Sequence, residues 1–589
     1  MKSKSGTSLA QPELQELLQK PRSGTLLADN KQITIIPYQG SKDKSRTVSP
    51  AEGESTDVVS SVIGNYGRWQ MLMTFLLSLF SLPCTFHIYL PTFTAAATKF
   101  WCQKPDNLTD LPMANWINYS QPPDGDSCMV RQLTDVVTVE SILNNTAPIL
   151  DTFVKCTEWV YDRSEVGNTI ISEWNLVCDR GYFTSLTESM FLIGVGVGGV
   201  VGGWISDKFG RKKILMGMMI AQCALAILSL LVRSFIQYLI VRLIMGFASV
   251  SVVYAAFVLS VELVGGKWVT IAGVCNFFWL PLAYVIVSLL SLAMPNWRDL
   301  QLSLSIPGCL LLALWFVLPE SPRWLISMGK TQEAKLVLEK AAKFNRLELP
   351  ADFDKLLMAY KTDTPDKGPS VTMLFKGTLR KRTICLFLSW YAMTIAYYGL
   401  LLNIGNFGTG NLHVTSIILA VVEIPAIAIS IPILLKAGRR IPIFTTMLVC
   451  GLACVASELF AMAFNDDRVK IACLMIGKFA IGSTNMMLPI YTVELYPTVV
   501  RNLGVGASQI SAGLALACIP YLWKLTMVNE YLPMMTIAAL AAIGGAIVLL
   551  LPDTTQPEES PVVIENKKTK YENITGRNGT FTISDDRGH

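Results

Sequence analysis

The sequence has little charge and almost no histidine. Asp, Glu, Lys and Arg make up 16% of its 589 residues and only three residues are histidine, whereas 51% are hydrophobic. Soluble domains carry roughly 25% charged residues, so this chain is too apolar for that class. So few histidines disfavour metal chemistry, and we interpret His87 and His413 as isolated polar residues at the edges of apolar segments.

Enzyme motifs and a leader peptide are also missing from the sequence. It contains no phosphate-binding glycine loop, no cluster of metal-ligand residues and no nucleophile–base set, so we expect no enzyme activity, cofactor, metal or nucleic-acid partner. Residues 1–65 are polar and lack the apolar core of a signal peptide. We therefore predict a disordered cytoplasmic tail over 1–65, followed by an uncleaved membrane anchor.

Long apolar runs are the main feature that is present. About twelve are long enough to cross a bilayer, which takes about 20 apolar residues each. They lie near 69–93, 184–206, 213–232, 235–260, 270–294, 300–318, 384–404, 412–435, 441–464, 471–493, 504–525 and 531–551. The expected fold class is an all-α membrane protein.

The placement of charge predicts the orientation in the membrane. The segment 97–183 is rich in acidic residues, whereas 323–382 is rich in basic residues and ends in Arg380-Lys381-Arg382. Basic loops stay on the cytoplasmic side, which places 323–382 there. An even number of spans then puts both termini, including the tail 552–589, in the cytoplasm.

The segment 97–183 also carries the features of an extracellular loop. Four of the 13 cysteines and three glycosylation acceptors fall within it: Cys102, Cys128, Cys156 and Cys178, with Asn107, Asn118 and Asn144. Both features are typical of an oxidising, glycosylating compartment, which disfavours the alternative of free thiols in a disordered loop. We predict two disulfides, and the sequence does not choose among the three pairings.

A short basic turn separates the second and third spans. It reads Gly203-Trp-Ile-Ser-Asp207-Lys-Phe-Gly210-Arg211-Lys212-Lys213, with Gly210 suited to the turn backbone. Asp207 among Arg211 and Lys212 forms a set of charges that can pair in one conformation and separate in another. The alternative is a plain basic determinant of membrane orientation.

Similar patterns recur in the two halves of the chain. Arg242-x-x-x-Gly246 with Glu262 resembles Lys478-x-x-x-Gly482 with Glu494, and Gly438-Arg439-Arg440 resembles Gly210-Arg211-Lys212. Leu435 stands where the repeat would place a counterpart of Asp207. We predict two six-helix bundles, 66–318 and 383–551, joined by a cytoplasmic linker, 319–382, with amphipathic helices.

Several motifs resemble one family. They are Glu173-Trp-Asn-Leu-Val-Cys178, Pro319-Glu-Ser-Pro-Arg-Trp-Leu325, Val422-Glu-Ile-Pro425 and Glu494-Leu-Tyr-Pro-Thr-Val-Val-Arg-Asn-Leu-Gly504. Over 66–553 the chain resembles the organic cation, carnitine and organic anion transporters of the major facilitator superfamily. The resemblance implies twelve helices in two bundles, alternating access and a plasma-membrane location. Relatives often have six loop cysteines, so one bridge is expected to be missing.

Candidate site residues are those that match the family's cavity and gate positions, together with Glu188, Tyr398 and Gly513, which depart from the family pattern there. The expected substrate-binding residues are Glu188, Trp390, Tyr397, Tyr398, Glu423, Asn485 and Gly513. The expected gating charges are Asp207, Arg211, Glu262, Arg439, Lys478, Glu494 and Arg501. Two alternatives stay open: Glu423 and Lys478 form a structural ion pair, or Trp390 and Tyr397 are core or lipid-facing aromatics.

The charges expected in the cavity favour amines as substrates. Val250 and Ile427 replace basic residues of many relatives, and Gly513 replaces an acid of cation carriers. We predict a secondary or facilitative transporter whose partners are the lipid bilayer and a small organic ion, either an organic cation or a zwitterionic amine. The alternatives are a sugar or neutral-solute porter and a non-transporting receptor or vesicle glycoprotein. The sequence fixes neither a coupling ion nor the oligomeric state.

Overall fold

The computed structural model describes residues 58–96, 98–134, 137–163, 167–349, 353, 371–402, 412–464, 467–497 and 500–553. Most of the predicted tails, and part of the predicted linker, lie outside these ranges. The predicted C-terminal tail, 552–589, is described only as far as Asp553.

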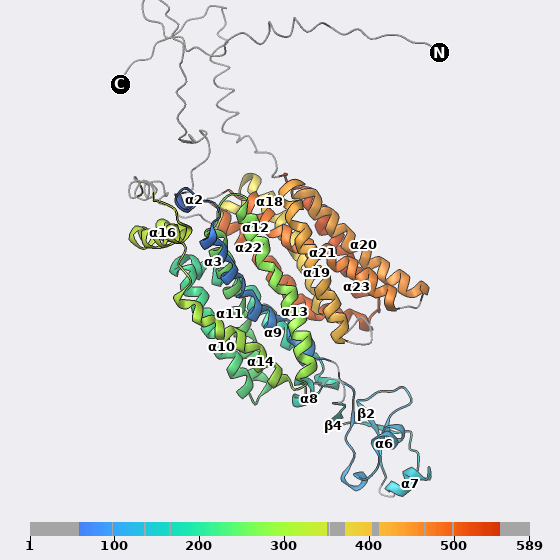
Figure 1. Ribbon diagram of the computed structural model, residues 1–589. Helices are drawn as coiled ribbons and strands as arrows, with labels where there is room; N and C mark the ends of the chain where they lie inside the picture. The colour runs from blue at the N-terminus through green and yellow to red at the C-terminus, as the bar shows by residue number, and fades with distance from the viewer. Residues whose placement is uncertain are drawn as a thin grey trace, which may run out of the picture. The chain divides into compact units, whose positions relative to one another are not determined.

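Helices make up most of the first half of the chain (Figure 1). An apolar 27-residue stretch, Arg68–Thr94, forms the first span from three consecutive helices. The helices of this half are α2 (Val58–Ile63), α3 (Arg68–Ser78), α4 (Ser81–Tyr89), α5 (Pro91–Thr94), α9 (Tyr182–Phe209), α10 (Arg211–Leu231), α11 (Phe235–Glu262), α12 (Trp268–Cys275), η3 (Asn276–Phe278), α13 (Trp279–Ala293), α14 (Trp297–Leu311) and η4 (Leu312–Phe316).

The second half repeats this pattern after a short connecting region. The connecting elements are α15 (Pro322–Ser327), α16 (Thr331–Asn345) and η6 (Val371–Phe375). The helices that follow are α18 (Gly377–Leu402), α19 (Leu412–Lys436), α20 (Arg440–Phe464), α21 (Asp467–Leu495), α22 (Arg501–Leu522), η8 (Trp523–Met527) and α23 (Leu532–Val548). Because α18 begins at Gly377, the basic residues 380–382 lie on this helix, whereas the sequence analysis placed them in the linker.

Eleven helical segments in the described part are long and apolar enough to cross a membrane. The twelfth predicted span corresponds to α23, an apolar helix of 17 residues. Pro533 stands in its first turn, and Pro552 follows its end, where the missing amide hydrogen disfavours a longer helix. At 1.5 Å per residue, 17 residues span about 25 Å, slightly less than a typical hydrocarbon core.

The helices pack into two groups, one from each half of the chain. In the first, α9 packs on α11 and α10 packs on α11 and α14; in the second, α20 packs on α21 and α23 (Figure 1). The groups meet where α9 packs on α22 and α13 packs on α19. A Cβ atom on Gly194 would lie 2.1 Å from the Leu243 carbonyl oxygen, so glycine is required where α9 and α11 cross.

The cysteine-bearing segment between α5 and α9 forms a small domain with its own core. Strands β1 (Phe100–Cys102) and β4 (Trp159–Tyr161) pair antiparallel, as do β2 (Met129–Arg131) and β3 (Phe153–Lys155). Its other elements are η1 (Asp106–Leu108), α6 (Met113–Ser120), α7 (Val139–Leu143), α8 (Ile170–Trp174) and η2 (Cys178–Arg180). The core consists of Leu108, Leu111, Trp116, Val137 and Ile142.

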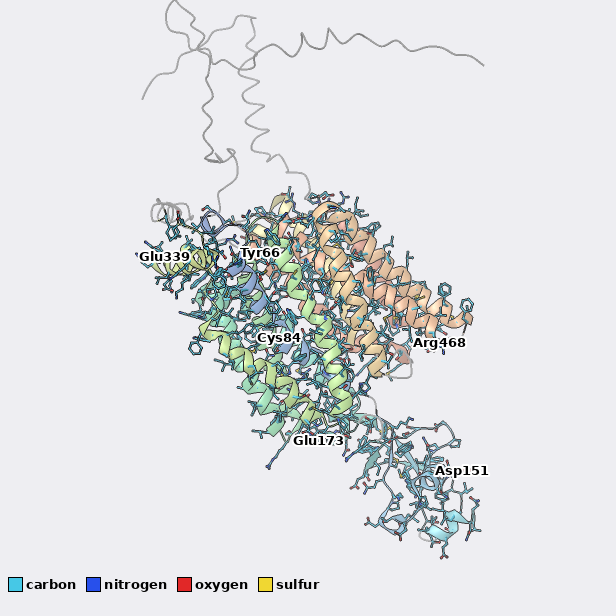
Figure 2. The ribbon with its side chains drawn as sticks, viewed as in Figure 1. Tyr66, Cys84, Asp151, Glu173, Glu339 and Arg468 are labelled. Atoms are coloured by element: carbon cyan, nitrogen blue, oxygen red, sulfur yellow. A yellow bond between two sulfur atoms is a disulfide. The ribbon has the colours of Figure 1, made fainter. Side chains whose placement is uncertain are left out.

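Disulfides hold this domain together, and an ion pair anchors it to the helices. The structure joins Cys102 to Cys156 and Cys128 to Cys178, which selects one of the three pairings that the sequence allowed. The acceptors Asn107, Asn118 and Asn144 are all exposed, as glycan attachment requires. Glu173, labelled in Figure 2, pairs with Arg298 at the start of α14 and accepts a hydrogen bond from Trp297.

The cysteine pairing is directly testable. Peptide mapping of the purified protein without reduction should recover linked peptides containing Cys102 with Cys156 and Cys128 with Cys178, because these are the pairs that the structure joins. The reduced sample is the control. A peptide that links Cys102 to Cys128 or Cys178 would contradict the structure.

Candidate functional site

A cavity of about 190 Å³ lies between the two groups of helices. Residues from α9, α11 and α13 line it from the first half, and residues from α18, α21 and α22 line it from the second. Cys84 on α4, labelled in Figure 2, is one of the lining residues. Tyr254 on α11 donates a hydrogen bond to Gln509 on α22, which joins the two halves at the cavity wall.

Aromatic rings dominate the cavity wall, and charge is missing from it. The described lining contains no Asp, Glu, Lys, Arg or His side chain. Its aromatic residues are Phe191, Tyr254, Phe257, Phe277, Tyr284, Trp390 and Tyr398. Neutral hydrogen-bonding groups, among them Asn485 and Gln509, complete the polar part. Such a wall can surround an apolar or cationic group by stacking, and it offers no fixed counter-ion.

Four of the residues that the sequence analysis proposed for substrate binding lie in this wall: Trp390, Tyr398, Asn485 and Gly513. The other three, Glu188, Tyr397 and Glu423, do not belong to the described lining. The indole nitrogen of Trp390 donates to the Thr492 hydroxyl at 2.9 Å, which fixes the ring against α21.

Glu423 instead faces Lys478 inside the second group of helices. A distance of 3.4 Å separates the Lys478 nitrogen from a Glu423 oxygen, and both side chains are 0% exposed. The Tyr397 hydroxyl donates to the other Glu423 oxygen at 2.5 Å, and the Lys478 nitrogen lies 3.5 Å from the centroid of the Tyr397 ring. This cluster joins α18, α19 and α21, so Glu423 and Lys478 neutralise each other behind the cavity wall.

Gly513 lies at the crossing of the two halves. A Cβ atom there would lie 2.6 Å from the Cα atom of Gly196 on α9, closer than two carbon atoms can approach. In this conformation a side chain at position 513 would therefore push α22 away from α9. The sequence analysis treated the position only as one that lacks a charge, because the backbone opposite it cannot be seen from sequence.

Two charge clusters stand at corresponding ends of the two halves. Arg211 lies 2.8 Å from Asp207 and 3.1 Å from Glu262. In the second half Arg439 lies 2.8 Å from Glu494. The structure thus brings together five of the proposed gating charges, while the side chain of Arg501 lies outside the described residues.

The sequence analysis missed the residues that hold the first cluster in place. Glu320 accepts a hydrogen bond from the Lys212 backbone at 3.0 Å, and the Trp324 indole donates to the Asp207 carbonyl at 2.7 Å. Arg323 donates to two carbonyl oxygens at the end of α11. In each of these hydrogen bonds the donor and the acceptor lie roughly 60 to 120 positions apart in the chain. The Pro-Glu-Ser-Pro-Arg segment was the only feature of the sequence that pointed to them.

Comparisons with known proteins agree with this architecture. The family described as "Sugar (and other) transporter" matches residues 150–555. The "Organic cation transporter protein" of Drosophila melanogaster is 32% identical over 546 residues, which cover 90% of this chain and 98% of that relative. The human "Organic cation/carnitine transporter 2" is 31% identical over 518 residues, 85% and 91% of the two chains.

The chain belongs to the organic cation and carnitine transporter family of the major facilitator superfamily. It is therefore a membrane transporter and not an enzyme, as the sequence analysis predicted. Among solved structures, the inward open xylose transporter of E. coli has a TM-score of 0.57 at 14% identity, covering 85% of this chain and 99% of that one. At this identity the likeness confirms the fold alone.

The geometry of the first charge cluster predicts that substitutions of its two acids, Asp207 and Glu262, slow uptake to different extents. The Glu262 side chain is 19% exposed and that of Asp207 is 47% exposed, so solvent screens Asp207 more. Asp207→Asn should cost about 0–1 kcal/mol and slow uptake by at most about fivefold. Glu262→Gln leaves the buried Arg211 poorly paired and should slow uptake by about tenfold or more.

The measurement is initial uptake of a transported cation, normalised to surface protein by biotinylation. Lys155→Gln is the matched control, because it breaks an exposed ion pair to Asp179 in the cysteine-bearing domain. Equal slowing by the two acid substitutions would contradict the argument from solvent screening. Wild-type uptake in Glu262→Gln would show that this cluster does not influence the transport cycle.

Proposed function

We propose that this transporter carries small organic cations and zwitterionic amines across the plasma membrane by alternating access. The observation that carries the proposal is the aromatic, uncharged cavity wall. Aromatic faces attract ammonium groups, and weakly hydrated quaternary amines are the cations that such walls favour. Each contact contributes about 0.5–2 kcal/mol, so several rings supply useful affinity without a buried carboxylate.

The same cavity wall favours amines over anions as substrates. Val250 lines the cavity, and Ile427 is fully buried on α19, at positions where the sequence analysis noted basic residues in relatives. Lys478, in the second group of helices, is paired with Glu423. An organic anion would enter this space without a counter-charge, and burying it unpaired is costly.

Alternating access is supported by the arrangement of the two halves. They touch at Gly196 and Gly513 without intervening side chains, and each half carries its own charge cluster at one end. In this proposal the halves rock about that contact, and the clusters, with Arg501 included, stabilise one of the two orientations. The cluster end faces the cytoplasm, together with both termini.

The relatives' names support an amine substrate. Besides the organic cation and carnitine carriers, a Drosophila melanogaster "Beta-alanine transporter" is 29% identical over 85% of this chain. The family description and the fold of the xylose transporter support the sugar alternative. The xylose transporter, however, is only 15% identical to this chain, so that similarity concerns the fold alone. The retained charge clusters argue against a receptor that does not transport.

Uptake by cells that express the protein tests the proposal. Oocytes should accumulate radiolabelled tetraethylammonium or L-carnitine well above water-injected controls, and should take up little p-aminohippurate or glucose. Uptake of p-aminohippurate alone, or of glucose alone, would overturn the proposed substrate class. Uptake of none of the four by protein at the cell surface would argue against an organic cation or zwitterion carrier.

Tyr398 tests the role of the aromatic wall. Tyr398→Phe keeps the ring and should leave KM for tetraethylammonium near the wild-type value. Tyr398→Leu removes the ring and should raise KM by about 2- to 30-fold, corresponding to the free energy of one lost cation–π contact. If Tyr398→Leu matches Tyr398→Phe, this wall does not bind the cation.

A further inference from the structure

The cavity wall contains a buried hydroxyl that the protein does not pair. Ser249 on α11 lines the cavity and is 3% exposed, and its oxygen has no hydrogen-bond partner among the described residues. Two positions later, Ser251 donates to the Phe247 carbonyl at 2.8 Å, which is how buried serines in helices commonly satisfy themselves. Ser249 therefore keeps an unused donor at the wall, which an acceptor on a bound molecule can satisfy.

Two carboxamides of the second half add further donors. The side-chain oxygen of Gln509 on α22 accepts the hydrogen bond from the Tyr254 hydroxyl, and its amide nitrogen has no partner among the described residues. Asn485 on α21 lines the cavity and makes no side-chain hydrogen bond with a described residue. An amide nitrogen carries two N–H donors, so both carboxamides can donate to a molecule in the cavity.

These polar groups lie at a similar depth in the helices. Tyr254, Gln509 and Asn485 each stand about eight to ten residues from the helix end near the charge clusters, or about 12 to 15 Å at 1.5 Å per residue. On α18, Trp390 and Tyr398 lie about 13 and 21 residues from the corresponding end, so their rings stand deeper in the same cavity. Donors and aromatic faces thus occupy successive levels of the wall.

The wall offers a carboxylate neutral donors and no cation. No Lys, Arg or His side chain belongs to the described lining, and Gly513 leaves no room for a side chain against Gly196. A carboxylate that leaves water needs hydrogen-bond donors, and donors bind a charged acceptor more strongly than a neutral one. A free anion would still lack a counter-charge here, whereas a zwitterion brings its own ammonium group.

From this arrangement we infer that Ser249, Gln509 and Asn485 form a subsite for the carboxylate of a zwitterionic amine, whose ammonium group lies against the aromatic rings. Gln509 is the central residue, because it meets the Tyr254 hydroxyl across the boundary between the two halves. A quaternary amine without a carboxylate leaves these donors unpaired, so the subsite favours zwitterions over simple cations. The inference rests on the proposed function and names its preferred substrate class.

L-carnitine and its methyl ester test the subsite, because the ester keeps the trimethylammonium group and masks the carboxylate. In the wild type, KM for uptake should be lower for L-carnitine than for the ester. Gln509→Met removes the amide and should raise KM for L-carnitine about tenfold or more, while KM for the ester stays within about twofold. Gln509→Glu places a like charge beside the carboxylate and should raise KM for L-carnitine but lower it for the ester.

Ser508→Ala is the matched control for these variants. Ser508 is a neutral polar residue on the same helix, donates to the Gly504 carbonyl at 3.2 Å and does not belong to the described lining. Its substitution should leave both KM values unchanged. Equal increases in KM for the two compounds in Gln509→Met would mark Gln509 as a structural residue and overturn the subsite.

Thermal unfolding of the purified full-length protein tests the subsite without transport. L-carnitine should raise Tm more than its methyl ester at the same concentration in the wild type and in Ser508→Ala, because the tighter ligand stabilises the folded state more. This difference should vanish in Gln509→Met. Protein at the cell surface that takes up neither compound, with the Tm difference present, would contradict the proposed function and leave the subsite standing. Equal stabilisation of the wild type by both compounds would overturn the subsite.

Discussion

A charge inside a bilayer must find a partner or be neutralised, and this constraint governs the structure. In the second half Glu423 and Lys478 meet with 0% exposure, and Tyr397 supplies both a hydrogen bond and a ring face. In the first half Arg242 donates a hydrogen bond to the His87 carbonyl oxygen and stacks on the Phe191 ring. The two halves therefore repeat the helical architecture while treating their buried charges differently.

The consequence for the cavity is neutrality. Glu423 forms an ion pair with Lys478 and does not line the cavity. The cavity wall therefore consists of aromatic rings and neutral polar groups. In the proposed function, selection then depends on cation–π attraction, shape and the cost of desolvating the substrate, rather than on one fixed counter-ion. Such a wall tolerates both a cation and a zwitterion, as the two substrate classes of the proposal require.

Much of this architecture could be predicted from the sequence. Apolar runs located the spans, and the basic turn around Gly210 marked the charge cluster of Asp207, Arg211 and Glu262, because helix ends and turns are encoded locally. The environment of Glu423 could not be resolved, since an acid beside a cavity and an acid paired with Lys478 leave the same pattern in the chain. That choice depends on how α18, α19 and α21 pack.

The contact at Gly513 could not be predicted from the sequence for a similar reason. The sequence shows a missing charge at that position, but the backbone of Gly196 that forbids a side chain belongs to a helix more than 300 residues earlier. Likewise, Glu320 and Trp324 stabilise the basic turn from the connecting region, across a separation that no local pattern reports. Long-range packing, and not local propensity, decides these features.

The central claim is that Glu423 is neutralised by Lys478 and does not hold the substrate. The most direct measurement is tetraethylammonium uptake, normalised to surface protein, in Glu423→Met, Lys478→Met and the double variant. Removing one partner of a buried ion pair strands the other charge, whereas replacing both with apolar groups is often tolerated. The account predicts that each single variant loses uptake and that the double variant regains most of it. A double variant that reaches the surface normally but takes up no cation would contradict it.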